Sequence, residues 1–248
     1  MQRPDFKCLH EPYGEPFHYN LEERLSQRYT DDEIRKDHAE KMESTYDSVT
    51  AELLAPVDNE RIFSKDMAQY IVKVGPEGDG FVVPVEKLRN MNHVFLIRSP
   101  ELACPSYYRC CTGDSSKETH FTHYDPEEAG YRELRMLFDQ IKDQGINGPN
   151  TLVVIDAETL SSDPETTLRY VCEEIGVEWD PRMLSWKSEK VKEFAKWPGF
   201  HKDAENSTGF KAVNRNHERD EELPEIVHQT IEENMPIYEY LKSFALKV

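Results

Sequence analysis

The chain has 248 residues and a mass of 29.0 kDa, which suits one α/β domain that withdraws roughly 70–75% of its unfolded surface from water. Hydrophobic residues make up 38% and charged residues 31%, a composition that excludes disorder throughout the chain. The formal net charge of −18 argues against partners such as nucleic acid or an anionic membrane, because both require a basic face. An anionic ligand must therefore find a local basic pocket.

Cysteine and histidine usage argues against disulfides and against a metal site. The five cysteines are an odd number without a CxxC pair, which favours a reducing compartment. The nine histidines are scattered, and His120 with His123 lacks further ligands at convincing spacing. Residues 1–7 have no apolar leader, and no stretch approaches the ~18 apolar residues of a membrane helix. We expect a cytoplasmic protein without a metal.

The first predicted element is a short buried strand over Phe6–Leu9, followed directly by His10, Glu11 and Pro12. A carboxylate or an imidazole at the end of a strand can take a proton from a hydroxyl group. Glu11 is our first-choice general base and His10 the second, while a His10 that simply packs beside the strand remains an alternative. Helical periodicity follows over Asp31–Leu54.

A second strand over Arg61–Ser64 runs into Lys65 and Asp66. A cation at the end of a strand can stabilise negative charge that develops beside it. Asp66 either orients Lys65 or forms an ordinary surface ion pair with it. The next segment, Gly75–Pro84, has three glycines and two prolines and is predicted to be a mobile loop.

A third strand over His93–Arg98 is followed by a helix that carries Ser106. Ligands of α/β proteins bind where the carboxyl end of a strand meets the N-terminus of a helix. Arg98 and the Ser106 hydroxyl can hold a phosphate there with charge-assisted hydrogen bonds. Alternatively, Arg98 pairs with an acidic residue and Ser106 caps the helix.

The rest of the chain alternates between helix and strand. Periodicity predicts helices over Gly130–Gly145, Pro164–Gly176 and Leu223–Leu246, a strand over Leu152–Ile155, and a weakly ordered stretch over Asp203–Glu222. In the helix that starts at Pro164, Asp163 is the expected cap. The alternation predicts one α/β domain over residues 1–248, with a mostly parallel sheet and helices on both faces.

Several of these segments together resemble sulfotransferases, enzymes with a P-loop NTPase-like fold that use 3′-phosphoadenosine 5′-phosphosulfate (PAPS). In that family an Arg ends a strand and a Ser eight residues later binds the 3′-phosphate, a spacing that Arg98 and Ser106 match. The resemblance implies that PAPS is the co-substrate and a small-molecule alcohol the acceptor. It also implies that Glu11 is the base and that Lys65 lies near the transferred group.

The segment Trp197–Phe210 resembles the late loop that closes over the nucleotide in these enzymes. The resemblance implies that Ser207, Thr208 and Gly209 present hydroxyls and backbone N–H groups to phosphate. It extends over nearly the whole chain and is nearest to a bacterial and fungal group with His-Glu-Pro at residues 10–12. That group points to secondary metabolism.

The sequence departs from this family in one respect. Family members begin with a strand, a phosphate-binding loop and a helix that wrap the 5′-phosphosulfate, whereas this sequence starts where that helix would end. The missing strand would lie centrally in the sheet. We therefore expect that the chain closes the gap, takes a strand from a partner as a homodimer, or is a fragment.

Three functions remain open at this point. The first is PAPS-dependent sulfuryl transfer. The second is acid–base chemistry without PAPS, such as isomerisation or cyclisation of a metabolite by Glu11, His10 and Lys65. The third is a non-catalytic binding protein. The acceptor is not predictable, although the loops Tyr13–Thr30 and Thr112–Asp125, with aromatic residues, are candidates for its pocket.

Overall fold

The computed structural model describes residues 3–57, 61–75, 78–145, 152–212 and 222–247. These residues form two compact units, the first built from Arg3–Arg89 and Met136–Ile146, and the second from Asn90–Arg135 and Asn147–Val248. A single domain over residues 1–248 stays a prediction. Within the described ranges, no helix combines the length and the apolar character needed to cross a membrane.

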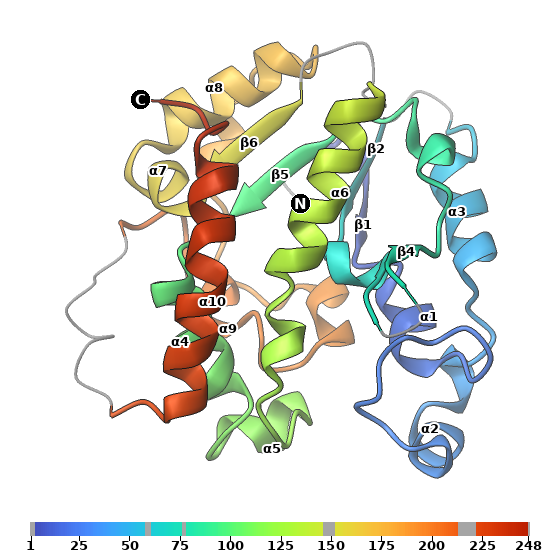
Figure 1. The fold of residues 1–248 in the computed structure, drawn as a ribbon. Helices are drawn as coiled ribbons and strands as arrows, with labels where there is room; N and C mark the ends of the chain where they lie inside the picture. Colours follow the sequence, from blue (N-terminus) through green and yellow to red (C-terminus); the bar gives the residue numbers. More distant parts are fainter. Residues whose placement is uncertain (1–2, 58–60, 76–77, 146–151, 213–221, 248) are drawn as a thin grey trace. The chain divides into compact units, whose positions relative to one another are not determined.

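The first unit contains a parallel pair of strands, β1 (Phe6–His10) and β2 (Arg61–Lys65). The two strands lie side by side (Figure 1), and their register places Phe6 opposite Arg61 and His10 opposite Lys65. Both predicted strands are confirmed. Because the strands are parallel and in register, the residues that follow them emerge at the same edge of the sheet.

The helices of the first unit are shorter than the sequence predicts. They are α1 (Gly14–Tyr19), α2 (Asp31–Asp37) and α3 (Tyr46–Leu54), with a 3₁₀ turn over Ala39–Lys41. The single helical segment predicted over Asp31–Leu54 is therefore wrong. Thr30 and Thr45 each form a capping box with the residue three positions on, so Thr45 starts a new helix.

The segment Gly75–Pro84 is partly regular, contrary to the prediction of a loop. Gly80–Phe81 forms β4, which pairs in the antiparallel sense with β3 (Val72–Lys73). Gly78 adopts a positive φ of 107° in the connection, a conformation that favours glycine. Short 3₁₀ turns over Ala68–Tyr70 and Val85–Leu88 flank this hairpin.

The second unit is built on another parallel pair, β5 (Val94–Ile97) and β6 (Val153–Asp156), which confirms the other two predicted strands. Val153 and Ile155 of β6 pack against Val171 in a buried cluster. Helix α10 contacts both strands and α4, and the Leu246 amide donates to the Val154 carbonyl at 3.3 Å (Figure 1). The major helices of this unit are α4 (Pro100–Cys110), α7 (Ala157–Ser162), α8 (Pro164–Glu174) and α10 (Glu225–Lys242).

The remaining helices are α5 (Ser115–Thr119), α9 (Lys202–Glu205) and α6 (Tyr131–Gln144), which starts in the second unit and ends in the first. Further 3₁₀ turns cover Pro126–Ala129, Pro181–Leu184 and Lys192–Lys196.

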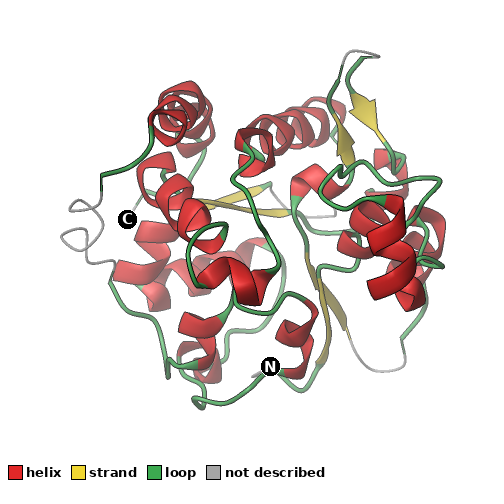
Figure 2. Ribbon diagram, turned by 90° about the horizontal axis from the view of Figure 1, so that it is seen from below, coloured by secondary structure: helices red, strands yellow, loops and turns green. Residues whose placement is uncertain are grey.

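The weakly ordered stretch predicted over Asp203–Glu222 is wrong at its start, which lies in α9, and residues 213–221 of it fall outside the described residues. Helices dominate the described structure (Figure 2). The class is α/β with short parallel strand pairs; one mostly parallel sheet with helices on both faces stays a prediction.

Candidate active site

Glu11 occupies an unusual backbone position directly after β1. Its φ of +48° lies in the left-handed region, which among the described non-glycine residues only His120 shares. The turn is closed by hydrogen bonds from the Glu11 amide to the Lys65 carbonyl at 2.7 Å and from the Gly14 amide to the Glu11 carbonyl at 3.1 Å. Such a conformation costs about 1–3 kcal/mol for a residue with a side chain, and strain of this kind clusters at functional sites.

The carboxylate of Glu11 is buried, with 5% of the residue exposed, and both of its oxygens have partners. Lys65 Nζ forms an ion pair with Oε1, and the Tyr70 hydroxyl donates to Oε2 at 3.1 Å. His10 Nε2 lies 3.9 Å from Oε1. The structure therefore brings the three predicted catalytic residues together and adds Tyr70, which the sequence analysis missed.

The pair between Lys65 and Glu11 joins a half-exposed ammonium to a buried carboxylate. The Lys65 side chain is 42% exposed and that of Glu11 7%. The Lys65 ammonium also contacts the thioether sulfur of Met67 at 3.3 Å. A buried carboxylate without a partner is strongly unfavourable, so this pair is more than an ordinary surface ion pair.

Asp66 holds the segment that follows Glu11. Its Oδ2 accepts a hydrogen bond from the Tyr13 amide at 3.3 Å, and the Tyr13 hydroxyl lies 2.9 Å from Thr50 Oγ1. Burial raises the pKa of Tyr13 to about 12. Asp66 thus ties the Glu11 turn to the end of β2, and the Tyr13 hydroxyl ties it to α3. The roles predicted for Asp66 stay predictions.

Arg98 lies in the second unit at the junction of β5 and α4, whereas Ser106 lies inside α4, six residues after the first residue of the helix. Arg98 is half-buried between the last residue of β5 and the helix N-terminus, and its carbonyl accepts a hydrogen bond from the Tyr131 hydroxyl at 2.7 Å. Ser99 is the N-cap residue, so the alternative in which Ser106 caps α4 is wrong. A guanidinium beside a helix N-terminus fits the binding of a phosphate.

Ser207, Thr208 and Gly209 form part of a loop that is held by the segment around Trp186. The Trp186 indole donates to Ser207 Oγ at 3.0 Å, and the Trp186 amide donates to the Thr208 carbonyl at 3.2 Å. Ser207 Oγ itself donates to the Ala204 carbonyl at 2.9 Å. Gly209 pairs with Ser185, and a side chain on it would lie 3.1 Å from the Leu184 carbonyl. Much of this loop's hydrogen-bonding capacity therefore maintains its own shape.

The aromatic residues proposed for the acceptor pocket are mostly core. Tyr13, Phe17 and Tyr19 are buried in the first unit, and Phe121 is buried in the second. Tyr124 is half-buried. Their packing gives no support to an acceptor pocket lined by these side chains.

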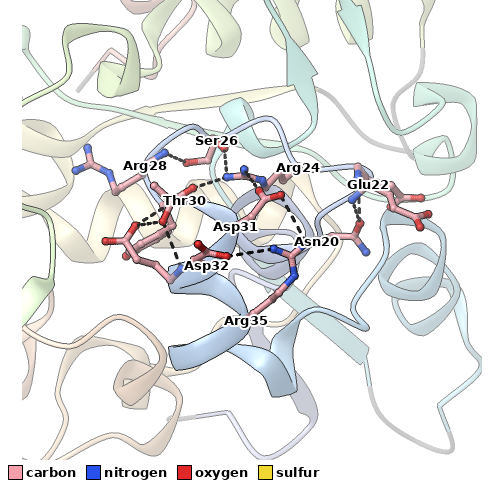
Figure 3. Close-up of polar contacts among 12 residues, drawn as sticks. Asn20, Glu22, Arg24, Ser26, Arg28, Thr30, Asp31, Asp32 and Arg35 are labelled. Carbon is pink, nitrogen blue, oxygen red and sulfur yellow. Dashed lines mark hydrogen bonds and ion pairs between the residues drawn. The ribbon is translucent and has the colours of Figure 1, made fainter.

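The loop between α1 and α2 is fixed by a polar network (Figure 3). The Asn20 side chain accepts from the amides of Glu22 and Glu23 at 3.0 Å and donates to the carbonyls of Met42 and Ser44. Arg24 donates to the Tyr29 carbonyl at 2.6 Å and to Asp31 at 2.7 Å. This network gives the residues that follow α1 a defined conformation.

The described strand–helix junctions differ from a phosphate-binding loop. The connections from β1 to α1 and from β5 to α4 contain no glycine, and α7 follows β6 without a connection. None of these described junctions supplies the glycine-rich cradle of backbone N–H groups that wraps a phosphate in P-loop proteins.

Comparison with known proteins identifies the family of the chain. A family model described as "Sulfotransferase domain" matches residues 1–245. The chain is 29% identical over 164 residues to Branched-chain-amino-acid aminotransferase-like protein 1 of Arabidopsis thaliana. It is 26% identical over 161 residues to Branched-chain-amino-acid aminotransferase-like protein 2 of the same plant. These matches cover 66% and 64% of this chain but 26% of each relative, so the chain spans about a quarter of their length. No solved structure matches.

Proposed function

Because the chain belongs to the sulfotransferase family, we propose that it transfers a sulfuryl group from PAPS to a hydroxyl group of a small molecule. The observation that carries this proposal is Glu11, a buried carboxylate on a strained turn that contacts Lys65 and Tyr70. A strained backbone is retained only where the surrounding structure enforces it.

The reaction moves one sulfuryl group and one proton. The acceptor oxygen attacks sulfur, the bond between sulfur and the phosphate oxygen breaks, and its electron pair leaves with the phosphate. Glu11 takes the proton of the acceptor hydroxyl, which gives a sulfate ester and 3′,5′-ADP. A fixed carboxylate accelerates such a proton transfer by about 10²–10⁴-fold. His10, 3.9 Å from the same carboxylate, is the second candidate for this role.

The basic residues take the negative charges of PAPS in this proposal. Lys65 stabilises the charge that develops on the leaving phosphate. Arg98, at the N-terminus of α4, binds the 3′-phosphate together with Ser106. Ser207, Thr208 and Gly209 contact the nucleotide through those groups that their loop does not use internally.

The test is release of 3′,5′-ADP from PAPS in the presence of a panel of alcohols and phenols. We expect Glu11→Gln to lower this rate by about 10²–10⁴-fold while 3′,5′-ADP still binds, because the substitution removes the base but no nucleotide contact. Arg98→Ala should instead abolish the binding of 3′,5′-ADP measured by calorimetry.

Glu52→Gln is the control, because Glu52 forms an ion pair with Lys7 at 3.0 Å in the same unit, but on the exposed surface. This variant should keep the rate of the wild type. A folded wild-type protein that does not bind 3′,5′-ADP would contradict the proposal. Turnover of a metabolite without PAPS that is lost in Glu11→Gln would support acid–base chemistry instead.

A further inference from the structure

Lys65 and Tyr70, which both contact the Glu11 carboxylate, differ in their freedom to move. Tyr70 is 6% exposed, and its ring packs against Phe17 and His18 with centroid distances of 4.8 and 5.8 Å. The Lys65 side chain is 42% exposed and reaches the carboxylate from a flexible stem. The hydrogen bond from Tyr70 is therefore part of the core, whereas the contact from Lys65 comes from a group with access to water.

The packing around Tyr70 extends into the ordered loop after α1. His18 is buried, and its Nδ1 lies 3.1 Å from Ser26 Oγ. The Ser26 amide donates to the Phe17 carbonyl at 3.1 Å, and the Ser26 carbonyl accepts from Arg24, as Figure 3 shows. This loop fixes the two rings that hold Tyr70, so the Tyr70 hydroxyl has little freedom to leave Glu11.

The proposed function requires Lys65 to serve two groups. Its ammonium pairs with Glu11, and it also stabilises the negative charge of PAPS. If Lys65 turned to an anion and Glu11 had no other partner, a buried carboxylate would be left uncompensated, which is strongly unfavourable. We propose that Tyr70 is a positioning residue that holds the Glu11 carboxylate in place while Lys65 exchanges between Glu11 and an anionic ligand. This inference rests on the proposed function and explains how one lysine serves both groups.

The exchange can be measured with inorganic sulfate as the anion, without PAPS or an acceptor. Protein labelled with ¹³C at the lysine Cε atoms is titrated with sodium sulfate at constant ionic strength, and the Lys65 signal is assigned by its loss in Lys65→Met. We expect the Lys65 signal to move with sulfate in the wild type. In Tyr70→Phe the affinity for sulfate should fall about tenfold. When Lys65 leaves Glu11 in this variant, the carboxylate no longer has the hydrogen bond from Tyr70, and a hydrogen bond to a charged group is worth about that much.

The matched control is Tyr46→Phe. Tyr46 is also buried in the first unit, and its hydroxyl is without a hydrogen-bond partner among the described residues. This variant removes the same atom from a similar environment and should bind sulfate like the wild type. Equal affinities in Tyr70→Phe and Tyr46→Phe would overturn the inference.

A second background separates positioning from a general structural role. Glu11→Gln carries no charge that needs compensation, so it should bind sulfate at least as tightly as the wild type, and adding Tyr70→Phe should then have no effect. A similar loss of affinity from Tyr70→Phe in both backgrounds would show a structural role only. If Tyr70→Phe does not fold, weaker sulfate binding by Glu11→Gln would by itself overturn the exchange. Failure to release 3′,5′-ADP from PAPS would sink the proposed function but leave these outcomes unchanged.

Discussion

Two buried carboxylates at the ends of parallel strands invite comparison, Glu11 after β1 and Asp156 at the end of β6. Each accepts a hydrogen bond from a buried tyrosine, at 3.1 Å from Tyr70 and at 2.6 Å from Tyr238. Asp156 also accepts the backbone amides of the first turn of α7 at 2.9 and 3.2 Å, and its φ is −84°. Glu11 has a left-handed backbone, and its second oxygen meets a half-exposed lysine.

The hydrogen-bond networks of Asp156 and Glu11 differ in what the carboxylate itself contacts. Lys242 donates to the Tyr238 hydroxyl at 3.0 Å, and Tyr238 donates to Asp156, which caps α7. Burial and this bond to Asp156 raise the pKa of Tyr238, so the hydroxyl stays a donor. Both networks reach an exposed or half-exposed lysine, but they differ at the carboxylate: Asp156 accepts the backbone amides of α7, whereas Glu11 pairs directly with Lys65. The cap gives Asp156 a structural role, and Glu11, whose side chain pairs with Lys65 and Tyr70, is the better catalytic candidate of the two.

The largest effect expected from this comparison is on stability, in the variant Asp156→Ala. It removes the cap of α7 and leaves the Tyr238 hydroxyl without its acceptor, so the free energy of unfolding should fall by about 3 kcal/mol. Urea denaturation followed by circular dichroism measures this change. The control Asp163→Ala removes a cap alone, from the Thr166 amide at 3.2 Å, and should cost about 1 kcal/mol. Equal losses in the two variants would show that the bond to Tyr238 contributes nothing.

A smaller effect on stability is expected at Glu11, where two substitutions distinguish the strain of the backbone from the loss of the side chain. Glu11→Gly and Glu11→Ala both remove the carboxylate, but only glycine adopts a φ of +48° without strain. Glu11→Gly should therefore be more stable than Glu11→Ala by about 1 kcal/mol in urea denaturation. At Glu52, inside α3, the order should reverse by a similar amount. If alanine were the better residue at both positions, the turn after β1 would not be strained.

The strands and several helices could be predicted because their signals are local. The four strands follow from apolar runs, and the helix α8 begins where Asp163 and Pro164 mark it, with Asp163 as the observed cap. The hairpin of β3 and β4 could not be predicted, because each strand has two residues and shows no alternation. The break between α2 and α3 was missed although Thr45 and Ser48 carry a capping signal.

The candidate site shows the same division between local and tertiary information. Glu11, His10 and Lys65 could be predicted to meet, because the carboxyl ends of neighbouring parallel strands lie at the same edge. Tyr70 could not, because its contact with Glu11 depends on a 3₁₀ turn that brings the ring back against α1. The hydrogen bond from the Trp186 indole to Ser207, 21 residues later, could not be predicted either, because it depends on how two loops pair.

The smallest effect expected is in the loop of Ser207, where Lys190 and Glu205 form a pair that contrasts with Lys65 and Glu11. Lys190 is 89% exposed and lies 2.9 Å from Glu205, which also accepts the Val191 amide at 3.2 Å. The bond from Lys190 and then that from Val191 lower the pKa of Glu205. A lowered pKa in the folded state stabilises the loop above the unfolded value of about 4.3 and ceases to do so as the pH falls through the folded value.

Hydrogen exchange of the Trp186 amide, which donates to the Thr208 carbonyl, reports on this loop. After correction for intrinsic rates, exchange should become a few-fold faster as the pH falls through the lowered pKa of Glu205, because a pair with an exposed lysine contributes little. In Glu205→Gln this acceleration should be absent, since no carboxylate is left to protonate. If the variant and the wild type respond equally, other carboxylates control the loop.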